Sequence, residues 1–432
     1  MNVSVEAAPI SPLRRYWRDR ALWTTIADVY AILAALTLPW STSLVAIFLV
    51  LWLGAVLWVM DWRAFGRLLK QPICCLPLGL VGLAAIGTLW SDAAWGTRFS
   101  AVNPTVKLLV LPVLFYHFER SKRGMWVFIA FLVSCTLLML MSWIVLIDPS
   151  LSLKAASEPG GRGIFVKNYI AQSQEFALSA VALVYPIIGL LRANEPWRAL
   201  ALGTLSLGFA VNMAFVIVSR TAMVTIPIML AVFAVLHLKW RTSLMIFGTL
   251  AILVALTWAT SPQLQQKTDA FLTEYQLYRT QNAATSIGLR LEFWKKSLGF
   301  FAEAPIVGHG TGSTRGLFER AASGEISSAT REVIGNPHNQ TLNIAVQWGI
   351  IGIIVLYAMW LAHLLLFRGE GLVAWIGLLV VVQNMFTSLF NSHIFDFHEG
   401  WMYVLGVGVA GGMVLQERAR GMAGERPGTV WS

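Results

Sequence analysis

Long apolar runs alternate with short polar segments along almost the whole chain. A helix needs about 20 apolar residues to cross a bilayer, and unpaired backbone groups exclude open strands there. The pattern therefore predicts an all-α polytopic membrane protein with about twelve transmembrane helices. The predicted spans are 22–40, 43–60, 72–90, 104–118, 125–147, 170–191, 199–218, 221–238, 243–260, 340–366, 372–390 and 401–416.

One polar stretch is much longer than the others and separates the ninth span from the tenth. Part of it, SIGLRLEFWKKSLGFF, carries apolar residues at helical spacing with basic residues off that face. Such a helix either lies in the membrane interface or packs on the bundle. The apolar stripe consists of Ile287, Leu291, Trp294, Leu298 and Phe301, and the basic residues are Arg290, Lys295 and Lys296.

The runs divide the chain into four parts. Residues 1–260 hold spans one to nine with an outer loop at 148–169, and 261–339 form a large, mostly helical domain on the outer side. Residues 340–416 hold the last three spans, and 417–432 form a cytoplasmic tail.

Composition and charge agree with this layout. The chain is 57% hydrophobic and 12% charged, whereas soluble domains are about 25% charged. The net charge of +10 comes largely from Lys and Arg in alternate short loops, which is typical of cytoplasmic loops. The excess of basic residues therefore reflects topology rather than nucleic-acid binding. Both termini are predicted to be cytoplasmic, and the first apolar run is predicted to be an uncleaved anchor.

Several classes of chemistry lack their motifs. Cys74, Cys75 and Cys135 lie in or beside predicted spans, without the spacing of a disulfide framework or a metal site. No Walker sequence, no paired acidic motif in an outer loop and no G-x-S-x-G is found. We therefore expect no metal and no other cofactor.

The segment GNPHNQ places a histidine where the long polar stretch meets an apolar helix. Asn336 is predicted as the N-cap, Pro337 as the first helical residue and His338 as the next. The positive end of a helix dipole favours a neutral imidazole, and its free N–H groups can receive an anion. These features indicate a general base beside a phosphate-bearing substrate.

Four basic residues on the predicted outer side oppose the cytoplasmic bias. Arg220 lies in a minimal turn between two spans, Arg290 on the predicted interfacial helix, and Arg162 and Lys167 in the loop GGRGIFVKN. A guanidinium donates paired hydrogen bonds to phosphate. The alternative for each is an ion pair or contact with lipid headgroups.

Two further polar motifs accompany them. Gly308–Gly312, which contains His309, has the glycines of a phosphate loop but lacks its strand–loop–helix setting, so we interpret it as a turn that shapes the site. In NSHIFDFHEG, the spacing of His393, Asp396 and the acidic and histidine residues after them fits no standard metal site. One member of this group is expected to orient or hydrogen-bond the catalytic centre.

The layout and these motifs resemble the O-antigen ligase and polymerase superfamily of bacterial inner membranes. The resemblance covers the whole arrangement of spans and the large late periplasmic loop. Locally it rests on Ser219-Arg220-Thr221, on Arg290 with Trp294, Pro305 and Gly308–Gly312, and on His338-Asn339 with Leu342, Gly349 and Gly352.

The resemblance implies transfer of a polysaccharide from undecaprenyl pyrophosphate to a sugar hydroxyl of lipid A–core, in lipopolysaccharide assembly. It implies a metal-independent and ATP-independent reaction at a periplasm-facing site, with no nucleic-acid partner. The catalytic residues it implies are His338, Arg220 and Arg290. As substrate contacts we predict Arg162, Lys167, Asn339, His309, His393 and Asp396.

The chemistry of such a donor fits these residue types. Pyrophosphate is already a good leaving group, so arginines need only stabilise its charge while a base takes the hydroxyl proton. One displacement without an enzyme nucleophile inverts the anomeric configuration. Alternatives that use the same donor are an O-antigen polymerase and a pilin O-oligosaccharyltransferase. More distant ones are a lipid-linked sugar transporter and a membrane scaffold.

Overall fold

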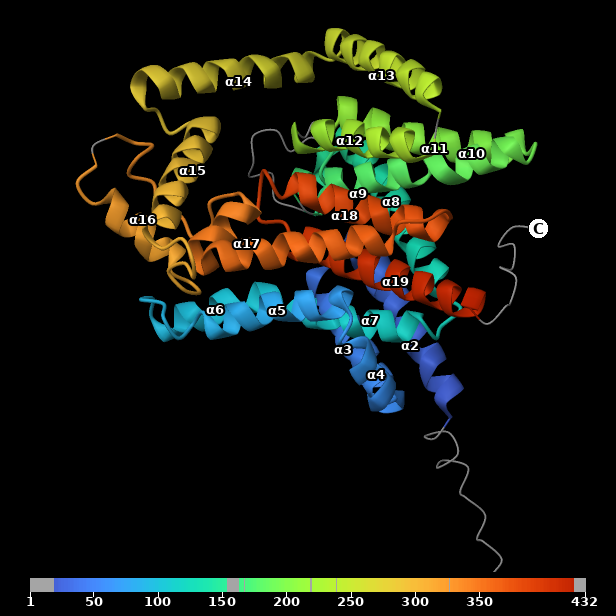
Figure 1. Ribbon diagram of the computed structural model, residues 1–432. Helices are drawn as coiled ribbons and strands as arrows, with labels where there is room; N and C mark the ends of the chain where they lie inside the picture. The colour runs from blue at the N-terminus through green and yellow to red at the C-terminus, as the bar shows by residue number, and fades with distance from the viewer. Residues whose placement is uncertain are drawn as a thin grey trace, which may run out of the picture.

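The computed structural model describes residues 19–153, 163–166, 168–217, 220–237, 239–325 and 327–422, and it contains no strand in these ranges. Figure 1 shows a bundle of helices with a projecting arm. The α-helices are α2 (Arg20–Thr37), α3 (Thr42–Val59), α4 (Trp62–Leu68), α5 (Pro72–Ile86), α6 (Trp95–Val106), α7 (Val110–Phe118), α8 (Gly124–Ile147), α9 (Tyr169–Ala182), α10 (Val184–Arg192), α11 (Pro196–Phe215), α12 (Arg220–His237), α13 (Trp240–Thr260), α14 (Pro262–Gln281), α15 (Ser286–Glu303), α16 (Thr314–Ala322), α17 (Gln340–Leu366), α18 (Leu372–Thr387) and α19 (Phe397–Met422). The 3-10 turns are η1 (Lys107–Leu109) and η2 (Pro149–Leu151).

Seven described helices are long and apolar enough to cross a membrane, or eight if the bent pair α4–α5 counts as one span. This finding confirms an all-helical, multi-pass protein. A helix lies at each of the twelve predicted positions, but α2 and α19 are not among these candidate spans, and α12 and α18 contribute only shorter apolar stretches. The number twelve therefore stays a prediction.

Two predicted boundaries differ from the structure. The fourth span begins at Trp95 rather than at 104, since α6, η1 and α7 together form a candidate span over Trp95–Phe118. The last helix, α19, continues to Met422, so the predicted tail from 417 begins inside a helix. In both cases polar residues continue a helix beyond the apolar run that we used to place it.

Glycines let two helices of the core approach closely. A Cβ on Gly408 of α19 would lie 2.5 Å from Leu114 of α7, and one on Gly412 would lie 2.6 Å from Phe118. Small residues at four-residue spacing permit such contact between membrane helices. The pair α7–α19 therefore forms a tightly packed part of the bundle.

Helix α17 breaks at Gly349, where φ is +60° and ψ is −154°. The loop after α15 lies against this break, and the backbone N–H of Ile350 donates to the carbonyl of Pro305 over 2.8 Å. A Cβ on Gly349 would lie 2.3 Å from the carbonyl oxygen of Ile306. The glycine thus lets the loop reach the backbone of a core helix.

The predicted periplasmic region is helical, as expected. In Figure 1, α13 and α14 form the arm and α15 leads from it back to α17. Phe293 and Phe300 of α15 are buried in a small cluster with Phe318 of α16 and Val346 of α17. Of the predicted stripe, Trp294 packs against this cluster, whereas Leu298 is 56% exposed. Helix α15 therefore packs on the bundle, and the stripe identified only part of the packed face.

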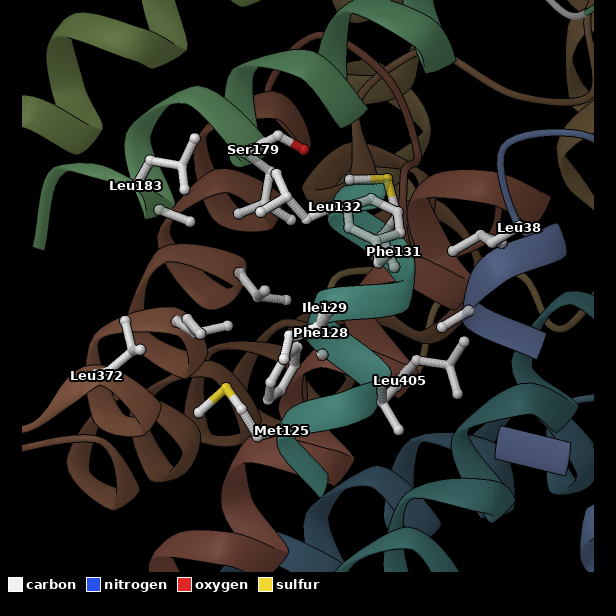
Figure 2. A pocket seen from close by; sticks show the side chains of 18 of the residues that line it. Leu38, Met125, Phe128, Ile129, Phe131, Leu132, Ser179, Leu183, Leu372 and Leu405 are labelled. Carbon is white, nitrogen blue, oxygen red and sulfur yellow. The ribbon is translucent and has the colours of Figure 1, made fainter. Parts of the chain in front are cut away.

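An apolar cavity of about 260 Å³ lies between α8, α9, α18 and α19. Figure 2 shows Leu, Ile, Phe and Met side chains around it, with the Ser179 hydroxyl as a polar group. Leu372, in the first turn of α18, lines this cavity. Its lining includes no acid, base or cation, so the chemistry must lie elsewhere, beyond the other end of α18.

Candidate active site

His338 lies just outside helix α17 rather than in its first turn. The helix begins at Gln340, and the side chain of Asn339 is its N-cap. Pro337 is therefore not the first helical residue, and the predicted register was wrong by three residues. Asn336, the predicted cap, instead accepts a hydrogen bond of 3.0 Å from the backbone N–H of His338.

The backbone of His338 adopts φ +53°, in the left-handed region. Such a conformation costs a non-glycine residue on the order of 1 kcal/mol or more and is concentrated at functional sites. Because His338 precedes the N-cap, it is not part of the first helical turn, and the argument that the helix dipole favours a neutral imidazole does not apply to it. The hydrogen-bond partners of the ring define its environment instead.

The start of α17 is bound to the segment between α18 and α19, which we call the 388–396 segment. The backbone N–H of Gln340 donates to the carbonyl of Ser388 over 2.9 Å, and its side-chain oxygen accepts from the N–H of Ile394 over 3.0 Å. The amide of Asn339 donates to the carbonyl of Leu389 over 3.0 Å. These buried contacts hold the two segments together as one unit.

A hydrogen-bonded series of side chains leads away from the imidazole. Nδ1 of His338 lies 3.0 Å from Oδ1 of Asn391. Nδ2 of Asn391 donates to Oδ2 of Asp396 over 2.7 Å. On the far side, Nζ of Lys107 donates to the backbone carbonyls of Phe395, over 3.2 Å, and of Asp396. His338 is thus connected through Asn391 to a carboxylate.

The carboxyl group of Asp396 has a pKa raised from 3.8 to about 6, because burial disfavours its charge more than Lys107 favours it. It is still mainly ionised at neutral pH. A carboxylate only accepts hydrogen bonds, which matches the contact with the Asn391 amide.

His393 and Arg290 occupy the other side of this segment. The His393 ring is 1% exposed, and neither ring nitrogen has a hydrogen-bond partner among the described residues. Burial, and next the charge of Arg290, lower the pKa of His393 to about 3. The ring of Phe293, one turn after Arg290 on α15, lies 6.3 Å from that of His338. Helix α15 therefore brings its predicted arginine to the histidine-bearing unit.

The structure describes less of the other three predicted cations. Arg220 is the first residue of α12, and its side chain is outside the described part. Arg162 and Lys167 lie outside the described residues altogether. Their roles stay predictions.

Residues 205–357 match the family described as O-antigen ligase. The matched stretch, about a third of the chain, is similar to the O-antigen ligase superfamily. It is also 24% identical over 168 residues to an uncharacterized protein of Haemophilus influenzae. That match covers 38% of this chain and 42% of the relative, so the chain spans less than half of the relative's length.

The match to the O-antigen ligase family includes Arg220, Arg290 and His338 but ends before the 388–396 segment. This match confirms the resemblance that the sequence motifs indicated.

The glycine loop Gly308–Gly312 is fastened to the bundle. The backbone N–H groups of His309, Gly310 and Thr311 donate to the carbonyls of Val346, Gln347 and Gly87, each over 2.9 Å. With these donors occupied, the loop is a connector at the break of α17 rather than a phosphate cradle.

The ring of His309 has a structural contact of its own. Its Nε2 lies 2.7 Å from the carbonyl oxygen of Phe300, near the end of α15. This contact favours a structural role over the predicted substrate contact.

The described residues contain no group of three or more His, Cys, Asp or Glu side chains that could hold a metal ion. The residues of NSHIFDFHEG have different surroundings. Asp396 accepts a hydrogen bond from Asn391, and His393 is influenced by the charge of Arg290. The expectation that one of them contacts the histidine unit fits this arrangement.

Sequence reasoning missed Asn391 as a functional residue and assigned no role to Lys107 at this site. Asn391 lies five residues before Asp396 in the same polar segment, which is the local signal that could have drawn attention to it. Lys107 is a cation inside an apolar run, and such residues are usually paired or functional.

Proposed function

We propose that this protein transfers a polysaccharide from undecaprenyl pyrophosphate to a sugar hydroxyl of lipid A–core, at the periplasmic face of the bacterial inner membrane. The observation that carries the proposal is the position of His338, held at Nδ1 by Asn391, on a unit that also contacts α15 with Arg290. A held imidazole and an adjacent guanidinium are the base and the anion-stabilising group that this transfer requires.

In the proposed reaction, His338 accepts the proton of the acceptor hydroxyl while that oxygen attacks the anomeric carbon. The bond from this carbon to the pyrophosphate oxygen breaks, and the electron pair leaves with the pyrophosphate. Arg290 and Arg220 stabilise the charge on the departing group. The product has inverted configuration, and neither a metal nor ATP takes part.

Several other residues are proposed as substrate contacts. His393, next to Arg290, and Asp396 flank the centre, and Asn339 caps the helix beside it. Arg162 and Lys167 are proposed to contact the donor from the loop at 148–169. His309 is retained here only as a support of the loop on which α15 ends.

The test is transfer by the purified full-length protein in detergent, with undecaprenyl-pyrophosphate glycan, lipid A–core and EDTA. We expect wild-type product, and a loss of about 100-fold or more in His338→Ala. His398→Ala, a histidine on α19, is the matched control and should retain activity. Unchanged transfer in His338→Ala would contradict the mechanism.

The same assay separates the proposed ligase from a polymerase, which would use the same residues. Elongation of the lipid-linked glycan without transfer to lipid A–core would identify a polymerase. Product with retained anomeric configuration, measured by NMR of the new linkage, would overturn the single displacement.

A further inference from the structure

The amide of Asn391 has only one orientation that suits both of its neighbours. Its NH₂ group donates and its oxygen accepts. Nδ2 lies 2.7 Å from the Asp396 carboxylate, whereas Oδ1 lies 3.0 Å from Nδ1 of His338. Turning the amide over would place two acceptor oxygens in contact at Asp396. The carboxylate therefore determines which end of the amide faces the histidine.

The same reasoning fixes the proton on the imidazole. Since Oδ1 of Asn391 can only accept, Nδ1 of His338 must carry the hydrogen. The neutral ring then has its lone pair on Nε2. We propose that Asn391 and Asp396 are positioning residues that keep the proton of His338 on Nδ1 and so make Nε2 the base. This inference rests on the proposed function and deepens it.

Asp396 is itself held in place. Lys107 is 8% exposed and donates to the carbonyls of Phe395 and Asp396. A Cβ on Gly400 would lie 2.5 Å from Nζ of Lys107, so the start of α19 packs against the ammonium group. These contacts fix the backbone from which the Asp396 carboxylate reaches Asn391.

The arrangement also serves the charged state of the ring. When Nε2 takes the hydroxyl proton, the imidazolium forms with its Nδ1–H already directed at an amide oxygen. The Asp396 carboxylate, one residue further, stabilises the positive charge. The proton leaves to water from Nε2 after pyrophosphate has departed, so the positioning pair neither gains nor loses a proton during the cycle.

Other charged or titratable groups border this unit from each packed element. The charge of Arg290 on α15 acts on His393 in the 388–396 segment and, with burial, keeps that histidine neutral. Lys107 on η1 and Glu399 on α19 lie on the far side of Asp396. A test must therefore move the negative charge relative to the histidine while leaving the other groups unchanged.

Two variants change the negative charge near His338 in opposite ways: one removes it and the other brings it closer. Asp396→Asn removes the negative charge and leaves the Asn391 amide free to turn. The exchange variant Asn391→Asp/Asp396→Asn keeps the same atoms but brings the carboxylate directly to Nδ1, with the new amide donating to it. Asn103→Asp, an exposed position on α6, is the control for an added carboxylate.

The readout is labelling of His338 by diethylpyrocarbonate as a function of pH, followed by mass spectrometry of the peptide. This reagent reacts with unprotonated imidazole nitrogen and requires no substrate. We expect the labelling midpoint to move up by about one pH unit in the exchange variant. It should move down in Asp396→Asn and stay unchanged in Asn103→Asp.

Transfer activity is measured on the same preparations. Asp396→Asn should lose about ten- to a hundredfold, as is usual for a supporting residue behind a functional group. The exchange variant should recover most of that loss, with its acid limb shifted upward like its labelling midpoint. A merely structural role for the pair cannot produce midpoint shifts of opposite sign.

The outcomes distinguish this inference from the proposed function. If the variants fold but their labelling midpoints do not move, and the wild type transfers glycan, the inference is overturned and the proposed function stands. If the midpoints of the variants move as expected but the wild type transfers no lipid-linked glycan, the positioning pair is supported and the proposed function is refuted.

Discussion

Lys107, in the fourth predicted span, donates a hydrogen bond to the backbone carbonyl of Asp396, which follows 289 residues later in the chain. The contact joins η1 to the 388–396 segment, whose other side is bound to the start of α17. A cation from the first half of the bundle therefore supports a unit built from its last three helices.

Replacing this cation should destabilise the protein. In Lys107→Gln the half-buried Asp396 and the buried Glu399 lose the ammonium charge near them, and the carbonyls of Phe395 and Asp396 lose its hydrogen bonds. A hydrogen bond from a charged group contributes about 1.5–3 kcal/mol. We expect a clearly lower thermal midpoint in detergent, whereas Lys295→Gln, an exposed lysine on α15, should leave it unchanged. Equal midpoints for the two variants would show that Lys107 is not needed as a support.

The acid limb of the activity should report the protonation of Asp396. The pKa of Asp396 is raised to about 6, mainly by burial, so its carboxylate takes up a proton as the pH falls through 6 and no longer fixes the Asn391 amide. The rate of transfer should therefore fall as the pH drops through 6.

In Asp396→Asn the residual activity should lack this component of the acid limb and fall with a smaller slope, because the carboxyl group is absent. The measurement is the initial rate of transfer between pH 4.5 and 8 at saturating donor. The same raised pKa means that Asp396 contributes stability below its unfolded value of 3.8 and loses it as the pH rises through 6. An acid limb with the same slope in both proteins would contradict this assignment.

The positions of the helices could be predicted from the sequence because continuous apolar runs have few alternatives in a bilayer. The start of α17 shows where this reasoning fails. Both Asn336 and Asn339 are good caps, and Pro337 made the first one attractive. The structure selects Asn339 because its amide also reaches the carbonyl of Leu389, a contact that no local pattern contains.

The individual members of the site were visible as polar residues among apolar runs, but their partners were not. Asn391 and His338 are 53 residues apart and meet only because α17 and the 388–396 segment are bound together. The packed face of α15 was predicted only in part, because the stripe contained Trp294 but not Phe293 and Phe300, which meet residues of two other helices. Tertiary packing determines both the contact between Asn391 and His338 and the packed face of α15. Helical periodicity alone carries no information about such packing.

The break of α17 should not tolerate a side chain. In Gly349→Ala the residue must keep φ at +60°, and its Cβ would lie 2.3 Å from the carbonyl oxygen of Ile306. Strain of this kind costs more than about 1 kcal/mol. The expected result is a lower thermal midpoint and reduced transfer, because the loop that ends α15 must shift.

Gly82→Ala is the matched control, since a Cβ at this position of α5 meets nothing within 4 Å. Alanine is the better helix former, so this variant should be as stable as the wild type or slightly more stable. If Gly349→Ala behaved like Gly82→Ala, the loop would not depend on the glycine.

Arg290 should require its guanidinium and not only its charge. Arg290→Lys keeps a cation on α15 but loses the planar pair of donors that suits a phosphate. We expect transfer to fall about tenfold or more, mainly through the rate at saturating donor, because the arginine acts on charge that develops as pyrophosphate departs. Arg315→Lys, at an exposed ion pair with Glu319 on α16, is the matched control and should retain full activity. A lysine enzyme with the wild-type rate at saturating donor would show that a point charge is sufficient and would remove the paired hydrogen bonds from the mechanism.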